Sequence, residues 1–392
     1  MAGNNSRSTG LDLLRFCVTT VVLSAHARNF GDAGKIFGIP GAPGTVLGLL
    51  PASGWVAVDI FFVLSGFLVS GLLFRETKET GTVSVRRFLI RRGLKIYPAF
   101  WVMLACSAAW ILGHHGSISL MAWLSELFYF QNYEVFICFH TWSLAVEEHF
   151  YFLLAGLFWI LKLRSGAKSG INFHAIPDLF LAVAVLCLLL RLTTWLVILN
   201  VTNQNSVWFT HADHALLDSL FFGVMLSHFW HNRWDESVKQ RLVRWRWAFL
   251  GAGLTLVLPG VVPVMDLQWF RIFGFVLVYL GAGALILSCL ALDNLRPPWI
   301  ASRLAWLGRH SYSVYLWHLL AGDCLYPWVS LNLNTRIGWA LDTLIYLVLC
   351  WLLGILMARI VEFPILRIRD RFFPGIEKTD AVPGPLARRP VA

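Results

Sequence analysis

Long apolar stretches alternate with short polar segments along almost the whole chain. A helix that crosses a membrane needs about 17–25 mostly apolar residues. Stretches of this kind predict ten spans, at residues 11–29, 54–74, 97–113, 143–162, 178–199, 212–230, 247–265, 269–291, 304–324 and 337–360. The pattern therefore predicts an all-α, polytopic integral membrane protein.

The basic residues between the apolar stretches predict how the chain is oriented. Lys and Arg number 7, 3, 5, 3 and 7 in the segments 75–96, 162–169, 231–246, 292–309 and 359–392. The alternate segments hold few, so with ten spans every basic segment falls on one side. Because Lys and Arg favour the cytoplasmic side, we expect both termini in the cytoplasm.

Composition excludes a chain of soluble domains. The 392 residues are 57% hydrophobic and 14% charged, whereas soluble proteins are about 25% charged. The net charge of +10 lies in the segments between spans, which fits a topology signal better than a nucleic-acid patch. The seven cysteines form no C-x-x-C or Cys/His spacing, so we predict no metal site.

The same pattern predicts one transmembrane domain over residues 1–373 and a Pro-rich, disordered cytoplasmic tail over 374–392. Arg15 interrupts the first apolar stretch, so we expect an uncleaved span rather than a signal peptide. Segment 75–98 predicts a basic amphipathic helix on the inner leaflet, and 117–130 a short interfacial helix. No soluble domain is evident, so we expect the membrane unit to act alone or with a partner.

The first span carries two costly side chains, Arg15 and His26. Ionisable residues within a membrane usually face a protein interior or a wet cavity and have a role. Eleven helical steps are about three turns, so both would lie on one face, about 16 Å apart. Each alone also fits a structural reading, as an arginine reaching the headgroups and a packed histidine.

Further ionisable residues gather in the predicted outer half or near the middle of three other spans: Asp59, Glu147, Glu148, His149 and His318. Carboxylates beside an imidazole suit general-base chemistry, because a carboxylate orients the ring and stabilises imidazolium. The same residues would also suit a proton relay in a transporter. Structural ion pairing is the third reading.

A second group lies near the predicted cytoplasmic ends: Arg15, Arg91, Arg92, Lys95 and Glu362. Each cation alone fits ordinary pairing with lipid headgroups. Together they would also form an anion site for a phosphorylated cytosolic donor, with Glu362 pairing one of the arginines.

Six ordered pieces of the sequence resemble the acyltransferase-3 family of bacterial membrane O-acyltransferases, which have ten predicted spans. They are Arg15-x10-His26, residues 54–71, 86–102, 141–154 and 307–318, and the Glu-x-Pro of Glu362 and Pro364. The resemblance covers essentially the whole chain. One departure is Arg92-x-x-Lys95, where the family shows R-x-x-R. Lysine keeps the charge but loses the fork that binds phosphate through two hydrogen bonds.

The resemblance implies transfer of an acyl group, commonly acetyl from cytosolic acetyl-CoA, to a hydroxyl of a glycan, lipid-linked saccharide or other exported acceptor. It implies a multi-pass protein of the bacterial plasma (inner) membrane. The expected partners are the lipid bilayer, acyl-CoA, the glycan or lipid-linked saccharide acceptor and glycan-assembly machinery, and no nucleic acid is expected. A secondary transporter or flippase using the same buried charges, and a non-catalytic membrane partner, remain the alternatives.

The expected roles follow from both lines of argument. His26 is the general base or a transient acyl carrier, oriented by Asp59 or by Glu147 or Glu148. The donor is held by the inner cations, with Glu362 fixing one of them. Candidate acceptor-binding residues are Trp142, His149, Tyr312 and His318.

Overall fold

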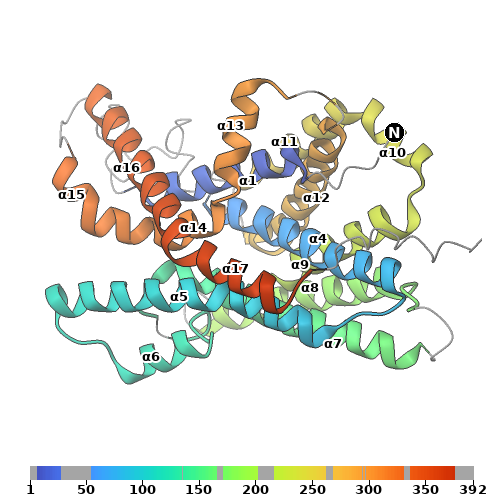
Figure 1. Cartoon of the computed structure of the whole chain (residues 1–392), viewed down its shortest axis with the longest axis horizontal. Coiled ribbons are helices and arrows are strands. Elements are labelled where there is room, and N and C mark those ends of the chain that lie inside the picture. The colour runs from blue at the N-terminus through green and yellow to red at the C-terminus, as the bar shows by residue number, and fades with distance from the viewer. Residues whose placement is uncertain are drawn as a thin grey trace, which may run out of the picture.

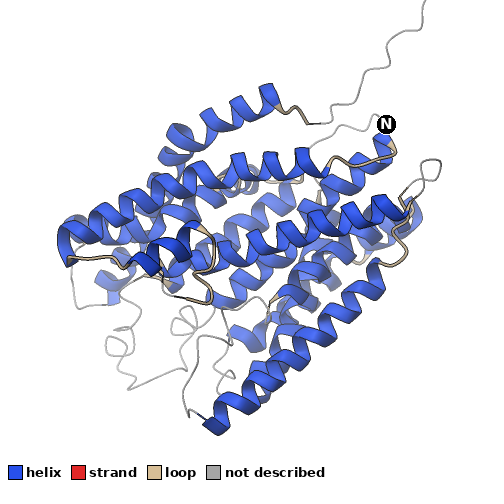
Figure 2. Ribbon diagram, turned by 90° about the horizontal axis from the view of Figure 1, so that it is seen from below, coloured by secondary structure: helices blue, strands red, loops and turns tan. Residues whose placement is uncertain are grey.

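The computed structural model describes residues 7–27, 54–165 except 135, 171–201, 216–261, 268–330 except 294 and 296, and 336–375. Within these residues every regular element is helical, as Figure 2 shows. Six helical segments are long and apolar enough to cross a membrane: Gly54–Thr80, Val85–His114, Phe139–Arg164, Ile176–Leu196, Ile272–Leu292 and Ala340–Phe372. The predicted all-α, multi-pass class is confirmed.

In chain order the elements are α1 (Thr9–Ala25), α4 (Gly54–Thr80), α5 (Val85–His115), α6 (Leu120–Leu127), η2 (Phe139–Thr141), α7 (Trp142–Arg164), α8 (Ile176–Val201), α9 (Leu217–His228), η5 (Phe229–Arg233), α10 (Glu236–Arg244), α11 (Arg246–Val261), α12 (Gln268–Leu292), α13 (Trp299–Gly308), α14 (Ser311–Leu320), η7 (Ala321–Leu325), α15 (Tyr326–Val329), α16 (Arg336–Met357), η8 (Ala358–Glu362) and α17 (Phe363–Phe372). Each predicted span coincides with one of these helices or a run of them. The count of ten and the side of each terminus stay predictions.

The helices begin where the sequence supplies caps. The hydroxyl of Ser8 accepts a hydrogen bond from the Leu11 N–H at 3.0 Å and starts α1. Ser84 and Ser119 cap α5 and α6 in the same way. These residues satisfy N–H groups that the first helical turn leaves without a partner.

The predicted surface helix over 75–98 is not a separate element. Its first part is the end of α4 and its last part is the start of the long α5. The intervening turn is held by Glu76, whose carboxylate accepts from the Ser84 N–H at 2.8 Å and pairs with Arg87 at 2.5 Å. Arg75 and Lys78 therefore lie at the end of α4, whereas the later basic residues of this segment lie on α5.

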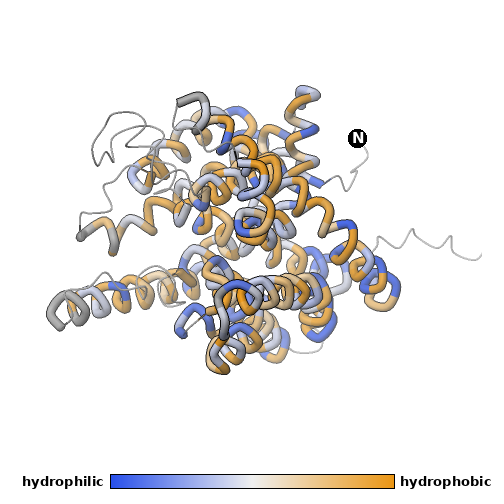
Figure 3. The backbone as a smooth tube through the Cα atoms, turned by 90° about the vertical axis from the view of Figure 1, so that its left-hand side faces the viewer, coloured by the Kyte–Doolittle hydropathy of each residue, from blue (hydrophilic) through white to orange (hydrophobic). Residues whose placement is uncertain are grey.

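Helices α4, α5 and α7 run roughly along the horizontal axis of Figure 1. There α6 and α15 lie at one end, whereas α10 lies at the other. Apolar residues predominate along the helices, as the orange stretches of Figure 3 show. Residues 376–392 lie outside the described residues, so the predicted disordered tail is not tested.

Glycines allow the central helices to approach closely. A Cβ at Gly66 in α4 would overlap the carbonyl of Leu220 in α9, and one at Gly223 would overlap the carbonyl of Val63. A Cβ at Gly308 in α13 would likewise overlap the backbone of α1. Small residues at helix contacts let backbones pack directly, which is a main source of helix association in membranes. Helix α1 packs against α4, α12, α13 and α14.

The predicted interfacial helix is α6, and it anchors the segment that leads into α7. Glu126, which is fully buried, accepts hydrogen bonds from the backbone N–H groups of Ile137 and Cys138, both at 3.0 Å. It also accepts from the Thr141 hydroxyl at 3.0 Å. Loss of water around the carboxyl outweighs these bonds and raises the pKa of Glu126 to about 7. Glu126 thus fixes the short helix η2, which carries His140.

Candidate functional site

Helix α1 presents Arg15 and His26, as the sequence predicts. The helix is continuous from Thr9 to Ala25 and His26 caps its C-terminal end. Both side chains are half-buried. Uninterrupted helix between them keeps the expected separation of about 16 Å along the axis. One element therefore holds a cation near one end and an imidazole at the other.

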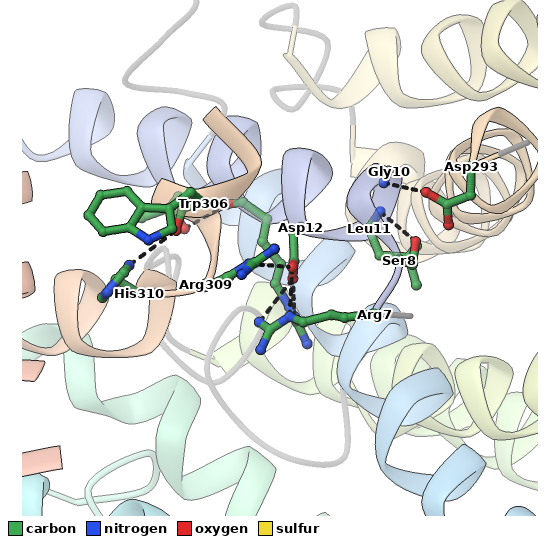
Figure 4. Close-up of polar contacts among 11 residues, drawn as sticks. Arg7, Ser8, Gly10, Leu11, Asp12, Asp293, Trp306, Arg309 and His310 are labelled. Atoms are coloured by element: carbon green, nitrogen blue, oxygen red, sulfur yellow. Dashed lines mark hydrogen bonds and ion pairs between the residues drawn. The ribbon is translucent and has the colours of Figure 1, made fainter. Parts of the chain in front are cut away.

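Arg15 belongs to an ion cluster centred on Asp12, a residue that sequence reasoning did not select. Asp12 is 1% exposed and pairs with Arg7 at 2.6 Å, Arg15 at 2.7 Å and Arg309 at 3.4 Å. Figure 4 shows Arg7 and Arg309 directed at this carboxylate. One anion is thus shared by three cations from two parts of the chain, which leaves the cluster with net positive charge.

Arg92 and Lys95 of α5 extend this positive region. Their charges lie close enough to Arg15 to interact with it, and Glu147 of α7 lies close to both. The Glu147 carboxylate accepts a hydrogen bond from Tyr151 at 2.9 Å. The Arg92 guanidinium lies 5.5 Å from the centre of the Tyr151 ring. The inner cations and one predicted carboxylate are therefore brought together.

Two residues of the predicted inner group have other partners. Arg91 pairs with Asp370 of α17 at 3.1 Å and donates to the carbonyl of Phe373. These contacts hold α17 against α5. Glu362 accepts a hydrogen bond from Ser313 at 2.7 Å. No ion pair among the described residues includes Glu362, although Lys95 lies close enough for their charges to attract. The expected pairing of Glu362 with an arginine is not formed.

The hydrogen bond of His26 fixes which nitrogen is available for chemistry. Its Nδ1 lies 2.9 Å from the carbonyl oxygen of Val22. A carbonyl can only accept, so Nδ1 carries the hydrogen and the neutral ring has its lone pair on Nε2. A backbone carbonyl thus orients the ring in the way a carboxylate would.

The carboxylates predicted to orient His26 lie elsewhere. Asp59 is 1% exposed, near the buried ion pair of Arg191 in α8 and Asp218 in α9. Its two oxygens have no hydrogen-bond partner among the described residues. Glu148 accepts from the Tyr97 hydroxyl at 2.8 Å. In the described part of the chain, His26 therefore has no hydrogen bond to a carboxylate.

Two further imidazoles lie close to His26. His318 lies with its ring centre 5.0 Å from that of His26, at 65°. His140 of η2 lies 4.9 Å beyond, against His318 at 80°. Sequence reasoning selected His318 and missed His140, which directly precedes the Thr-Trp-Ser of the motif at 141–154.

The other candidate acceptor residues are spread over the core. Trp142 is buried and its ring lies 6.2 Å from Phe62. Tyr312 donates to the carbonyl of Ile96 at 2.9 Å. His149 is half-buried, with its ring 5.6 Å from Phe130. These contacts fix the side chains of Trp142 and Tyr312 and place His149 beside the segment that follows α6, and the acceptor-binding role of all three stays a prediction.

A family model described as an acyltransferase domain matches residues 8–359. The chain belongs to the acyltransferase-3 family. The match includes the site elements from α1 to α16 and ends within η8, before Glu362. No solved structure matches the chain.

Relatives in this family are similar to the chain over most of its length. The peptidoglycan O-acetyltransferase OatA of Listeria monocytogenes is 27% identical over 71% of this chain and 45% of its own length. The O-acetyltransferase OatA of Staphylococcus aureus is 26% identical over 68% of this chain and 46% of its own. The chain spans about half the length of the curated relatives it matches.

Several members of the site could have been found from simple signals. Asp12 stands three residues before Arg15, which puts the two on one helix face. Arg191 and Asp218 are isolated charges in apolar stretches and so were candidates for a buried pair. Their partnership joins two different helices, and no spacing in one sequence shows it.

Proposed function

We propose that this protein transfers an acyl group from a cytosolic acyl-CoA, with acetyl-CoA as the first donor to test, to a hydroxyl of an exported glycan or lipid-linked saccharide. The observation that carries the proposal is the pair of groups on α1. Arg15 lies among inner cations, and His26 at the other end of the same helix carries its lone pair on Nε2.

The inner cations suit the phosphates of a CoA donor. Arg15, Arg92 and Lys95 come from two helices, and their mutual repulsion is relieved by an anion. Charge-assisted hydrogen bonds to phosphate are about twice as strong as neutral ones. Asp12 holds Arg15 in place, so this guanidinium is oriented before the donor arrives. The pantetheine arm would then extend along α1 towards His26.

His26 would carry the proton transfer. Its Nε2 takes the proton of the acceptor hydroxyl as that oxygen attacks the thioester carbon. The new C–O bond forms, the C–S bond breaks, and the proton ends on the CoA thiolate. A two-step route through transient acylation of Nε2 uses the same atom. Val22 keeps the ring in the tautomer that both routes need.

The acceptor class rests on the relatives. A relative named for peptidoglycan O-acetylation supports an exported glycan as the acceptor of this chain too. A multi-pass protein that meets cytosolic donor and exported glycan would lie in the bacterial plasma (inner) membrane, beside the machinery that assembles the glycan. Asp59, Glu147 and Glu148 then act on the site through packing and charge rather than by holding His26.

The test supplies labelled acetyl-CoA and a glycan-bearing membrane extract to the full chain in proteoliposomes. We expect label in the glycan, reduced in Arg92→Gln and unchanged in Arg244→Gln, which removes an exposed cation of α10. Labelled glycan with both variants equally active would remove the inner cations from the donor site. No transfer from acetyl, succinyl or longer acyl-CoA, with transport of a saccharide instead, would replace the proposal with the transporter.

A further inference from the structure

Three histidines from separate elements meet at the outer end of α1. His26 ends α1, His318 lies in α14, and His140 lies in η2. His318 occupies the middle, with ring centres 5.0 Å from His26 and 4.9 Å from His140. The proposed reaction uses only His26, so the other two imidazoles have no assigned role.

Each ring gives one nitrogen to a backbone carbonyl. His26 Nδ1 bonds to Val22, His318 Nδ1 to Tyr315 at 2.5 Å, and His140 Nε2 to Leu316 at 3.0 Å. Because carbonyl oxygens only accept, these nitrogens carry the hydrogens. In the neutral state the three remaining nitrogens all have lone pairs.

Two of these lone pairs are buried without a donor. His318 is 0% and His140 is 2% exposed, and neither His318 Nε2 nor His140 Nδ1 has a hydrogen-bond partner among the described residues. A buried polar atom without a hydrogen-bond partner destabilises the folded state. One added proton would turn a lone pair into an N–H donor for a neighbouring imidazole. One added proton would therefore give the unpartnered nitrogens a hydrogen bond without any further side chain.

The surroundings hold the rings in place and add little charge. Tyr315 packs against the rings of His318 and His140, and its hydroxyl donates to the His140 carbonyl at 2.7 Å. Cys350 of α16 donates to the His318 carbonyl. In the described part of the chain no ion pair includes these histidines. The Glu147 carboxylate is close enough to interact electrostatically with Tyr315. Nor do three His, Cys, Asp or Glu side chains there come together to hold a metal ion.

We propose that His26, His318 and His140 share one proton during acyl transfer, an inference that rests on the proposed role of His26. The proton leaves the acceptor oxygen for His26 Nε2, passes to His318 and is shared with His140. Meanwhile the acceptor oxygen bonds to the acyl carbon and the C–S bond breaks. The proton then returns through His26 to the CoA thiolate. His318 and His140 touch no substrate and are positioning residues for His26.

Turnover in mixtures of H2O and D2O tests this relay, because a second proton in flight curves the dependence of kcat on deuterium fraction. We expect a curve for the wild type and a straight line for His318→Gln, which keeps a polar side chain but cannot hold the proton. In that variant kcat should fall about 100-fold, the lower part of the range for general acid–base groups, with KM for acyl-CoA unchanged. His228→Gln is the matched control, since His228 is also buried with one unpartnered nitrogen. Curvature retained in His318→Gln would overturn the relay.

A second measurement does not depend on turnover. With 15N-labelled histidine in bilayers, we expect the signals of the three rings to move together as pH is lowered, in one protonation step. His140→Gln should alter the His26 signal although the two rings are separated by His318. Three independent steps in the wild type would overturn the shared proton. Failure of acyl transfer with these signals intact would overturn only the proposed function.

Discussion

The Arg15 guanidinium donates to the Asp12 carboxylate at 2.7 Å, one helical turn away on α1. Asp12 is 1% exposed and serves Arg7 and Arg309 as well. A buried anion shared by three cations leaves positive charge for an incoming phosphate. It also fixes the direction of Arg15 before binding, which lowers the entropy lost when a ligand is bound.

Asp12→Asn should unfold the protein more easily. Removing one partner of a fully buried pair costs about 3–5 kcal/mol. Because the side chains of Arg7 and Arg309 are 52% and 48% exposed, solvent screens part of this loss and we expect a smaller one here. The midpoint of thermal unfolding in detergent measures the loss. The control is Glu236→Gln, whose pair with Lys239 is 82% exposed on the glutamate side, and exposed pairs contribute about 0–1 kcal/mol. Equal midpoints for Asp12→Asn and Glu236→Gln would refute the role of Asp12.

Lys95 should act on donor affinity. Its amine has no hydrogen-bond partner among the described residues and lies near Arg92 and Arg15. Hydrogen bonds to charged groups contribute about 1.5–3 kcal/mol, so Lys95→Gln should raise KM for acyl-CoA about tenfold or more. Lys95→Arg, which restores the fork, should keep or lower KM. A lower KM in Lys95→Gln than in Lys95→Arg would contradict a phosphate contact here.

Glu126 should make folding sensitive to pH. Burial raises its folded pKa to about 7 from an ordinary 4.5, so the folded state binds this proton more tightly than the unfolded state. The contribution to stability is fully present below about pH 4.5 and is lost as pH rises through about 7. Unfolding midpoints between pH 4.5 and 7 should therefore fall less steeply in Glu126→Gln. Parallel profiles for the two proteins would show that Glu126 does not contribute to the pH dependence of stability.

The contact of α4 with α9 should not tolerate a methyl group. In Gly66→Ala and in Gly223→Ala the new Cβ would overlap backbone of the opposite helix, so the helices must separate. Overpacking of this kind costs about 1–3 kcal/mol. Gly156→Ala is the control, because a Cβ there meets no atom within 4 Å. Unchanged unfolding midpoints in all three variants would show that the helices are not in direct contact.

Much of the fold could be predicted because the signal is local. Apolar length predicted a helix for each of the ten stretches, and Arg15 and His26 on α1 followed from helical spacing alone. The prediction of a separate surface helix over 75–98 was wrong. Glu76 and Arg87 close a tight turn, and the residues from Val85 onwards belong to α5. That contact joins residues eleven apart, beyond the reach of helical periodicity.

The site was predicted less completely because its partners come from different helices. The inner cations were expected and are found together, whereas Arg91 pairs with α17. His26 was expected to have a carboxylate and instead has the Val22 carbonyl and the ring of His318. A backbone acceptor leaves no trace in residue identity, so no sequence pattern could have shown it.

The most direct test of the account is thiol release from acetyl-CoA by the purified full chain, in the presence of a glycan-bearing extract, for wild type and His26→Gln. Both proteins should insert and unfold at similar temperatures, because His26 is half-buried and its backbone contacts remain. The account predicts thiol release by the wild type and a loss of about 100-fold or more in the variant, as expected for a general base. Equal release by both proteins would contradict it.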